Sequence, residues 1–169
     1  MKLEDVARKS PEFDFFEYFE GHTRASGWFT DRFGNVRRHF DGDFQGIWDG
    51  GSFELTEELR YTDGVVERRN WNFRKEADGR FTATSDSLVG TATGVQKGNS
   101  ANLKYRMHID LKDNKRWLVA INDWFFLQQD GSLHNVSEVY KWGLRIGSVS
   151  NVFSKPDTAV GLALRNNAA

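Results

Sequence analysis

The chain has 169 residues and a formal net charge of −1, with 28% charged and 14% aromatic residues. This length is that of one domain with room for a hydrophobic core. The near-zero charge gives no electrostatic basis for binding nucleic acid or an anionic membrane surface. The sequence has no cysteine, which excludes disulfides, thiolate chemistry and cysteine-ligated metals.

Residues 1–10 are polar, and we expect them to be frayed. They lack the apolar run of a signal peptide, and no stretch of the chain approaches the ~20 apolar residues of a membrane span. As the sequence is written, these features predict a cytoplasmic protein without a membrane span. A periplasmic or envelope location is the alternative if the sequence is a trimmed form.

The segment from Pro11 to Glu20 predicts a short helix. Phe13, Phe16 and Phe19 recur at helical spacing, acidic residues occupy the early turns, and Gly21 suits a C-cap. We expect the aromatic face of this helix to lie on the remainder of the fold and to close one of its ends.

From Arg24 to Ser154 polar and apolar residues alternate, most regularly over 101–111, where every odd position is apolar. A period of two is typical of strands with one dry and one wet face. Pairs that favour tight turns separate the strands: Gly34-Asn35, Asp49-Gly50, Asp63-Gly64, Asp78-Gly79, Gly98-Asn99, Asp113-Asn114 and Asp130-Gly131. The predicted strands are 24–32, 36–48, 53–61, 65–75, 80–89, 92–97, 101–111, 116–128, 133–142 and 145–154.

Long strands joined by hairpins favour a closed barrel. The predicted fold is therefore all-β: a single antiparallel up-and-down β-barrel of about eight to ten strands with a short N-terminal helix. We assign residues 11–155 to this domain and 156–169 to a C-terminal tail.

The hairpin turns predict which residues share the barrel interior. The even positions from Arg38 to Trp48 and the odd positions from Phe53 to Tyr61 face inward. A two-residue turn at Asp49-Gly50 places Phe44 opposite Leu55 and Gly42 opposite Glu57. A three-residue loop at 62–64 pairs Glu57 with Arg69, Leu55 with Trp71 and Phe53 with Phe73.

Glu57 and Arg69 are thus expected side by side on an aromatic inner face. Inward charges are costly unless they are paired or bound to a ligand. Two interpretations stay open: an internal ion pair that fixes strand register, or an arginine that receives the carboxylate or phosphate head of a ligand.

Strand 116–128 is apolar on both faces, so its phase is ambiguous. A two-residue turn at Asp130-Gly131 would place Val136, Glu138, Tyr140 and Trp142 inside together with Asp123. The register of strand 101–111 argues for the opposite phase.

No catalytic or cofactor motif stands out. The four histidines lack metal-ligand spacing, and there is no P-loop, dinucleotide fingerprint or nucleophile elbow. We therefore predict no metal and no cofactor; whether the protein is an enzyme stays open, with a leaning toward no. Acid–base work by Glu57 or Asp123 remains an alternative, because burial raises the pKa of a carboxyl group.

Several segments resemble a bacterial family catalogued as domain of unknown function 3833, over residues 13 to 154. They are Phe13-x-x-x-x-Tyr18-Phe-x-Gly21, Thr30-Asp-Arg-Phe-Gly34, Trp48-Asp-Gly50, Tyr61-x-Asp-Gly64, Leu88-Val-Gly90, Gly98-Asn-x-x-Asn-Leu103, Asn122-Asp-Trp124 and Lys141-Trp-Gly-x-x-x-Gly147. The resemblance implies a lipocalin-like (calycin) barrel, a fold that usually holds hydrophobic small molecules and has given a few isomerases and cyclases. Many relatives look like envelope lipoproteins, but this chain lacks their lipobox cysteine.

Three functions follow as hypotheses. The first is binding or carriage of a hydrophobic small molecule, fatty-acid-like or isoprenoid, in the lumen. Its site would comprise Arg69 at the ligand head with Glu57, Arg38, Phe44, Trp48, Leu55, Trp71, Tyr105, Tyr140 and Trp124. The second is a cofactor-independent isomerase, cyclase or lipid-modifying enzyme that uses Glu57 or Asp123. The third is a structural or interaction protein with a filled barrel. A homodimer through an exposed aromatic face is a further expectation.

Overall fold

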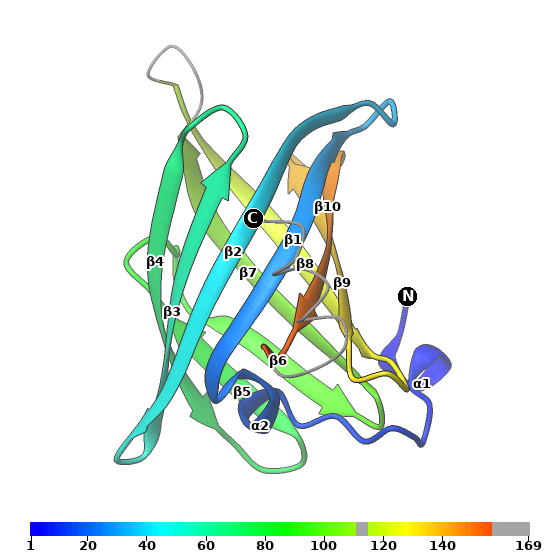
Figure 1. Ribbon diagram of the computed structural model, residues 1–169. Helices are drawn as coiled ribbons and strands as arrows, with labels where there is room; N and C mark the ends of the chain where they lie inside the picture. Colours follow the sequence, from blue (N-terminus) through cyan, green and yellow to red (C-terminus); the bar gives the residue numbers. More distant parts are fainter. Residues whose placement is uncertain (111–114, 157–169) are drawn as a thin grey trace.

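The computed structural model describes residues 1–110 and 115–156, which form a closed antiparallel barrel. Each strand pairs with the next along the chain and β1 pairs with β10, so the predicted fold is confirmed (Figure 1). The expected turn at Asp113-Asn114 and the tail after Pro156 lie outside the described residues. The elements are α1 (Leu3–Val6), α2 (Phe15–Phe19), β1 (Gly21–Asp31), β2 (Val36–Asp49), β3 (Ser52–Tyr61), β4 (Val66–Lys75), β5 (Arg80–Thr84), β6 (Ala92–Lys97), β7 (Ser100–Asp110), β8 (Arg116–Leu127), β9 (Leu133–Lys141) and β10 (Leu144–Ser154).

The β3–β4 hairpin has the predicted register. Glu57 pairs with Arg69, Leu55 with Trp71 and Phe53 with Phe73. The loop spans residues 62–64, closed by the Tyr61 amide, which donates to the Val65 carbonyl at 2.9 Å. Gly64 has a φ of 85°, which glycine adopts without steric cost and which the third position of such a loop requires.

The register of the β2–β3 hairpin differs from the predicted register by two residues. The turn residues are Gly50 and Gly51, one position later than expected, because Asp49 pairs with Ser52. As a result Glu57 lies opposite Phe44 and Leu55 opposite Gly46, so the expected pairings of Glu57 with Gly42 and of Leu55 with Phe44 are wrong. A shift of two residues keeps every side chain on its predicted face.

The phase predicted for β9 is wrong. Leu127 pairs with Leu133, so five residues connect β8 to β9 and the expected two-residue turn is absent from this connection. Asp130 shapes the longer loop by accepting hydrogen bonds from the Ser132 amide at 2.9 Å and its hydroxyl at 2.6 Å. The shift by one residue turns Val136, Glu138, Tyr140 and Trp142 outward and brings Asn135, Ser137 and Val139 inside. Asp123 itself faces inward.

The N-terminal segment crosses one end of the barrel, at the bottom of Figure 1. The first ten residues, expected to be frayed, include α1 with a buried Leu3, and Arg8 exchanges hydrogen bonds with Asn99 at 2.8 and 2.9 Å. The predicted helix is shorter than expected. It begins after Asp14, whose carboxylate accepts from the amides of Phe16 and Glu17, as an N-cap does. Of the helices in the described part of the chain, neither has the length and apolar character needed to cross a membrane.

Helix α2 closes its end of the barrel with phenylalanine rings. The Phe15 ring lies 5.0 Å from those of Phe73 and Phe81, and Phe19 lies 5.1 Å from Phe153. A β-carbon at Gly46 would lie 2.1 Å from the Phe19 carbonyl, so only glycine allows the helix to approach this closely. The interior at this end is therefore packed solid.

Candidate functional site

The barrel interior changes from filled to accessible along its axis. On β3 the inward residues Phe53, Leu55 and Glu57 are buried, whereas Leu59 and Tyr61 are half-buried. On β4 the order is the same, from buried Phe73 and Trp71 to half-buried Arg69 and Glu67. The inward side chains thus become partly exposed toward the end opposite α2, and we call the inner surface of this half the cup.

Arg69 organises one side of the cup. Its Nη1 donates to Glu57 Oε1 and its Nη2 to Glu67 Oε2. Glu57 also accepts from the Trp71 indole nitrogen at 3.1 Å, and Glu67 from the Tyr61 hydroxyl at 3.2 Å. Burial lowers the pKa of the Arg69 guanidinium, but the two carboxylates outweigh this effect and raise it. The arginine is therefore permanently charged and already paired with two acids.

Arg38 extends these charges toward the rim. It lies over the Tyr61 ring at 3.5 Å, contacts Asp63 through Nε and Nη2 at 3.0 Å, and reaches Glu67 at 4.0 Å. Three carboxylates and two guanidinium groups thus form a row along β2, β3, β4 and the β3–β4 loop. We call them the charged column: Asp63, Arg38, Glu67, Arg69 and Glu57.

The opposite side of the cup is apolar. Buried Met107, Val119 and Val139 form a cluster of their own, separate from the core under α2. Half-buried side chains from β1, β7, β8 and β10 pack on it: Phe29, Tyr105, Ile109, Trp117, Ile121 and Ile146. The sequence prediction named only Tyr105 among these, although the alternation in 101–111 places Met107 and Ile109 on the same face. The cup therefore has one charged and one apolar side.

Tyr105 and Asp123 lie at the floor, between the two sides. The Tyr105 hydroxyl donates to Asp123 Oδ2 at 2.9 Å, and its ring meets the Trp71 ring at 5.2 Å. Burial raises the pKa of Asp123 to about 6, more than the neighbouring Ser137 and Tyr105 hydroxyl groups lower it, and the charge of Glu57 raises it further. The pKa of Tyr105 is raised well above its usual value by burial and by Asp123.

The second oxygen of Asp123 is left without a partner. Ser137 stands beside the carboxyl group, but its hydroxyl lies within 3.3 Å of Asn135 Oδ1, to which it donates. In the part of the chain that the structure describes, Asp123 Oδ1 is buried and accepts no hydrogen bond. Because a buried acceptor without a donor is costly, this atom marks a place for a hydrogen-bonding group.

Three predicted ligand contacts lie outside the cup, toward α2. Phe44 and Leu55 belong to the packed core beneath the helix. Trp48 faces the same end, stacks on Phe16 at 5.4 Å and is 41% exposed. These side chains hold the barrel closed, and the expected tail site along them is already filled by the phenylalanines of α2.

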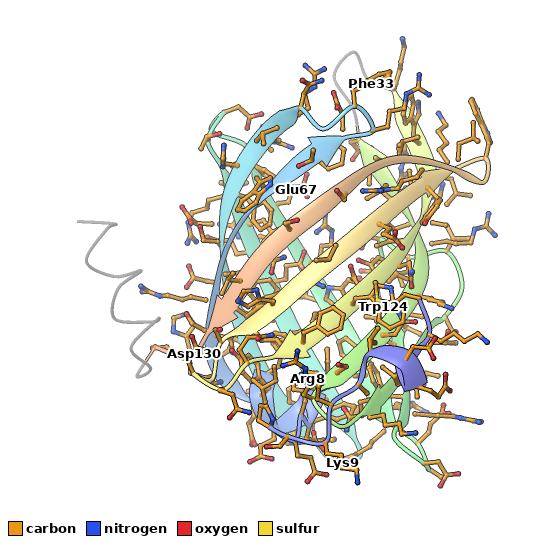
Figure 2. All side chains as sticks on the ribbon, turned by 90° about the vertical axis from the view of Figure 1, so that its right-hand side faces the viewer. Arg8, Lys9, Phe33, Glu67, Trp124 and Asp130 are labelled. Carbon is orange, nitrogen blue, oxygen red and sulfur yellow. The ribbon has the colours of Figure 1, made fainter. Side chains whose placement is uncertain are left out.

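Two further predicted contacts, Tyr140 and Trp124, are on the outer face, so their assignment to the lumen is wrong. Tyr140 lines an outer groove of about 330 Å3 with Lys104, Arg106 and Asn122. Trp124 follows inward Asp123 and is buried on the outside, next to the strands on which α1 packs (Figure 2). The five-residue β8–β9 connection explains the error for Tyr140, and the burial of both faces of β8 explains it for Trp124.

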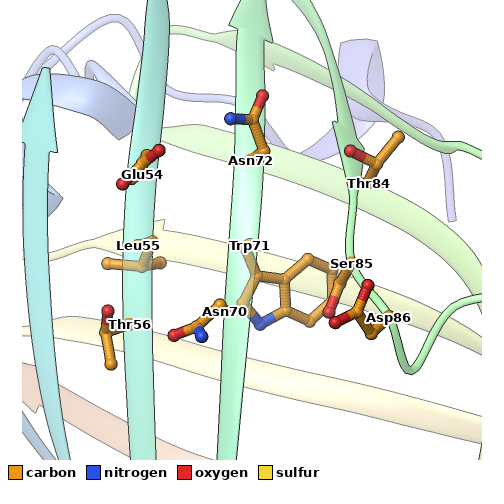
Figure 3. Close-up of a pocket in the computed structure, with 9 residues that line it drawn as sticks. All are labelled: Glu54, Leu55, Thr56, Asn70, Trp71, Asn72, Thr84, Ser85 and Asp86. Carbon is orange, nitrogen blue, oxygen red and sulfur yellow. The ribbon is translucent and has the colours of Figure 1, made fainter. Parts of the chain in front are cut away.

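A second groove, of about 510 Å3, lies where the barrel wall is incomplete. The last pair between β4 and β5 is Asn72 with Thr84, and beyond it the chain turns toward β7, where Leu88 bridges Met107. Figure 3 shows Trp71 among the lining residues, between Leu55 of β3 and the Ser85–Asp86 segment. Because Trp71 also faces Tyr105, its indole separates this groove from the cup floor. Across residues 1–110 and 115–156, no three His, Cys, Asp or Glu side chains are grouped so as to hold a metal ion.

Comparison with known proteins gives a family for this fold. The model of the family described as protein of unknown function (DUF3833) matches residues 1–155. The match begins before Phe13, the first residue of the motifs that resemble the family, and it includes both helices, all ten strands and thus the whole cup. No curated protein matches the chain. The chain therefore belongs to the DUF3833 family of proteins of unknown function.

Proposed function

We propose that the protein binds a small amphipathic molecule in the cup. The observation that carries this proposal is the division of one partly exposed inner surface into an apolar side and a charged side. Ligand pockets are typically apolar surfaces with a few placed polar groups, and barrels of this size hold one small ligand. The apolar body of the ligand would lie against half-buried side chains such as Phe29, Ile109 and Ile121, which pack on the buried cluster, with its polar group at the floor.

The filled end of the barrel limits how the ligand lies. Because the phenylalanines of α2 occupy the space beneath Trp71, the ligand enters from the open end and stops at Tyr105 and Asp123. An apolar tail along Phe44 and Leu55, as first expected, is not part of this proposal.

The charges of the cup favour a neutral head group. The cup holds four acids, Asp63, Glu67, Glu57 and Asp123. Its cations are the Arg38 and Arg69 guanidinium groups and the Lys141 ammonium group over the Trp117 ring, and Arg69 already binds two of the acids. An anionic head would meet an excess of negative charge, and it would have to displace a carboxylate from Arg69. A hydroxyl can instead donate to the unpartnered Asp123 Oδ1. Of the two ligand classes expected from the sequence, an isoprenoid-type alcohol thus fits better than a fatty-acid carboxylate.

Displacement of a neutral fluorescent apolar probe tests this proposal. At pH 7.5 we expect dodecanol to displace the probe at a concentration about tenfold lower than dodecanoate, which corresponds to one lost hydrogen bond to a charged group. Asp123→Leu should remove this preference, and Asp110→Leu, on the exposed end of β7, should retain it. Stronger displacement by dodecanoate would show that Arg69 binds an anionic head, and no displacement by either would contradict binding in the cup.

A second candidate function is acid–base catalysis by Asp123. A carboxyl group with a pKa of about 6, buried beside a tyrosine that stays protonated, can exchange a proton with a ligand near neutral pH. Exchange of the α-protons of an apolar cyclic ketone with deuterium from D2O, followed by NMR, would detect it. Asp123→Asn should abolish the exchange while leaving probe binding intact; exchange at the uncatalysed rate in the native protein would exclude this candidate.

A further inference from the structure

Exposed apolar side chains gather at the open end of the barrel. The β1–β2 and β9–β10 hairpin tips are neighbours there, because β1 pairs with β10 up to Asp31 and Gly147. Phe33 is 73%, Val36 50%, Trp142 89% and Leu144 65% exposed. Figure 2 shows Phe33 at the end away from α1. We call these four residues and the cations among them the tip patch.

The cations of the tip patch alternate with its apolar residues. Arg32, Arg37, Lys141 and Arg145 flank the two tips. Arg32 lies 4.6 Å from the Phe33 ring, and the Lys141 ammonium lies between two rings, 3.1 Å from that of Trp117 and 4.3 Å from that of Trp142. Within these two described tips, residues 31–37 and 141–145, the one acid is Asp31, which binds Arg37 and Asn35. Although the whole chain carries −1, the patch carries four positive charges against one negative charge.

Trp142 takes a backbone conformation that does not suit a bulky residue. Its φ is 53°, in the left-handed region where this kind of two-residue turn prefers asparagine, aspartate or glycine. The side chain gains little packing in return, since it is almost fully exposed and its ring contact is with Lys141. Strained residues of this kind cluster at functional sites.

We propose that the tip patch docks the open end of the barrel on an anionic phospholipid bilayer. Tryptophan and phenylalanine insert at the boundary between head groups and acyl chains, and nearby lysine and arginine side chains bind lipid phosphates. The protruding convex tips, with cations set between aromatic and aliphatic side chains, fit such a surface. Docking stands independently of what the cup binds, but it turns the mouth of the cup toward a source of amphipathic molecules.

Vesicle flotation tests the docking. The native protein should float with vesicles of equimolar phosphatidylcholine and phosphatidylglycerol, and should float much less with phosphatidylcholine alone or at high salt. Trp142→Ser should reduce the bound fraction about tenfold by removing the aromatic anchor. Arg32→Glu and Arg145→Glu should each reduce binding at least about fivefold, the loss expected for one cation near the surface.

Trp28→Ser is the matched control, because Trp28 is an exposed tryptophan on the outer face of β1, outside the two hairpin tips. It should float like the native protein. Thermal unfolding of each variant reports whether it is folded. We expect each variant to be folded, because the substitutions are at solvent-exposed positions. Failure of the native protein to float, or equal flotation of Trp142→Ser and Trp28→Ser, would overturn the proposal. The proposal would also be overturned if the native protein is a dimer that does not bind vesicles and that Trp142→Ser dissociates.

Discussion

Arg69 on β4 faces Glu57 on β3 across the inner surface of the barrel, and its second terminal nitrogen binds Glu67. The guanidinium therefore holds two carboxylates of its own chain in the wall of the cup. Its first role is to offset the cost of partly burying these two negative charges. Of the two interpretations that the sequence left open, an internal ion pair accounts for the contacts of Arg69.

Removing the guanidinium should destabilise the fold. Arg69→Met leaves Glu57 buried with only the Trp71 indole as donor. Breaking a fully buried pair costs about 3–5 kcal/mol, and because the Arg69 side chain is 18% exposed we expect about 2–3 kcal/mol. Urea unfolding at pH 7 measures this difference.

The neighbouring Arg68 provides the control for this prediction. It points outward, is largely exposed and binds Glu58, so Arg68→Met should cost less than about 1 kcal/mol. Adding Glu57→Gln to Arg69→Met should restore part of the loss by removing the unpaired charge. Equal losses for Arg68→Met and Arg69→Met would contradict the assignment of the two faces of β4.

Asp123 should make stability depend on pH between about 4 and 6. Its pKa is raised from 3.8 to about 6 in the folded protein. The folded state thus holds the proton more tightly, and the stability this gives is complete below pH 4 and lost as the pH rises through 6. The difference corresponds to about 3 kcal/mol. Asp123→Asn should remove this part of the pH profile, measured by urea unfolding from pH 4 to 8, whereas Asp110→Asn should preserve it.

The phenylalanines of α2 should be the main support of the closed end. Phe15 is buried against Phe73, Phe81 and Phe125, so Phe15→Ala should cost about 3–5 kcal/mol. Phe33→Ala, at an exposed hairpin tip, should change stability by no more than about 0.5 kcal/mol. A small effect of Phe15→Ala in thermal or chemical unfolding would mean that the helix does not fill the barrel.

The close contact between α2 and β2 gives a prediction of the opposite kind, in which an atom is added. Gly46→Ala would place a methyl group against the Phe19 carbonyl and the Phe53 ring, and should cost about 1–3 kcal/mol. Gly51→Ala, where a β-carbon meets nothing within 4 Å, should be nearly neutral. If both variants unfold at the same urea concentration as the native protein, α2 does not lie on Gly46.

The alternation of polar and apolar residues is enough to predict the barrel and the inner face of β2, β3 and β4. It also places Glu57 beside Arg69, because the loop at 62–64 has a length that turn chemistry defines. The register of a hairpin can be predicted from the sequence only where the length of its loop can be predicted. Where Asp130 and Ser132 form a five-residue connection, the inferred phase of β9 inverts and Tyr140 moves to the outer face.

The division of the barrel into a filled and an open half could not be predicted from the pattern. Phe44, Leu55 and Met107 all read as inward residues, yet only Met107 lies in the cup. The difference arises from α2, whose three buried phenylalanines fill one end. Sequence indicated that this helix would close an end of the barrel, but not which inward residues it would cover.

Native mass spectrometry of protein incubated with dodecanol tests most directly whether the cup binds a small amphipathic molecule. We predict a one-to-one adduct for the native chain. Ile121→Trp should lose it by filling the apolar side of the cup, and Ile47→Trp, at an exposed position on β2, should retain it. No adduct on the native chain, or equal adducts on Ile121→Trp and Ile47→Trp, would contradict the account.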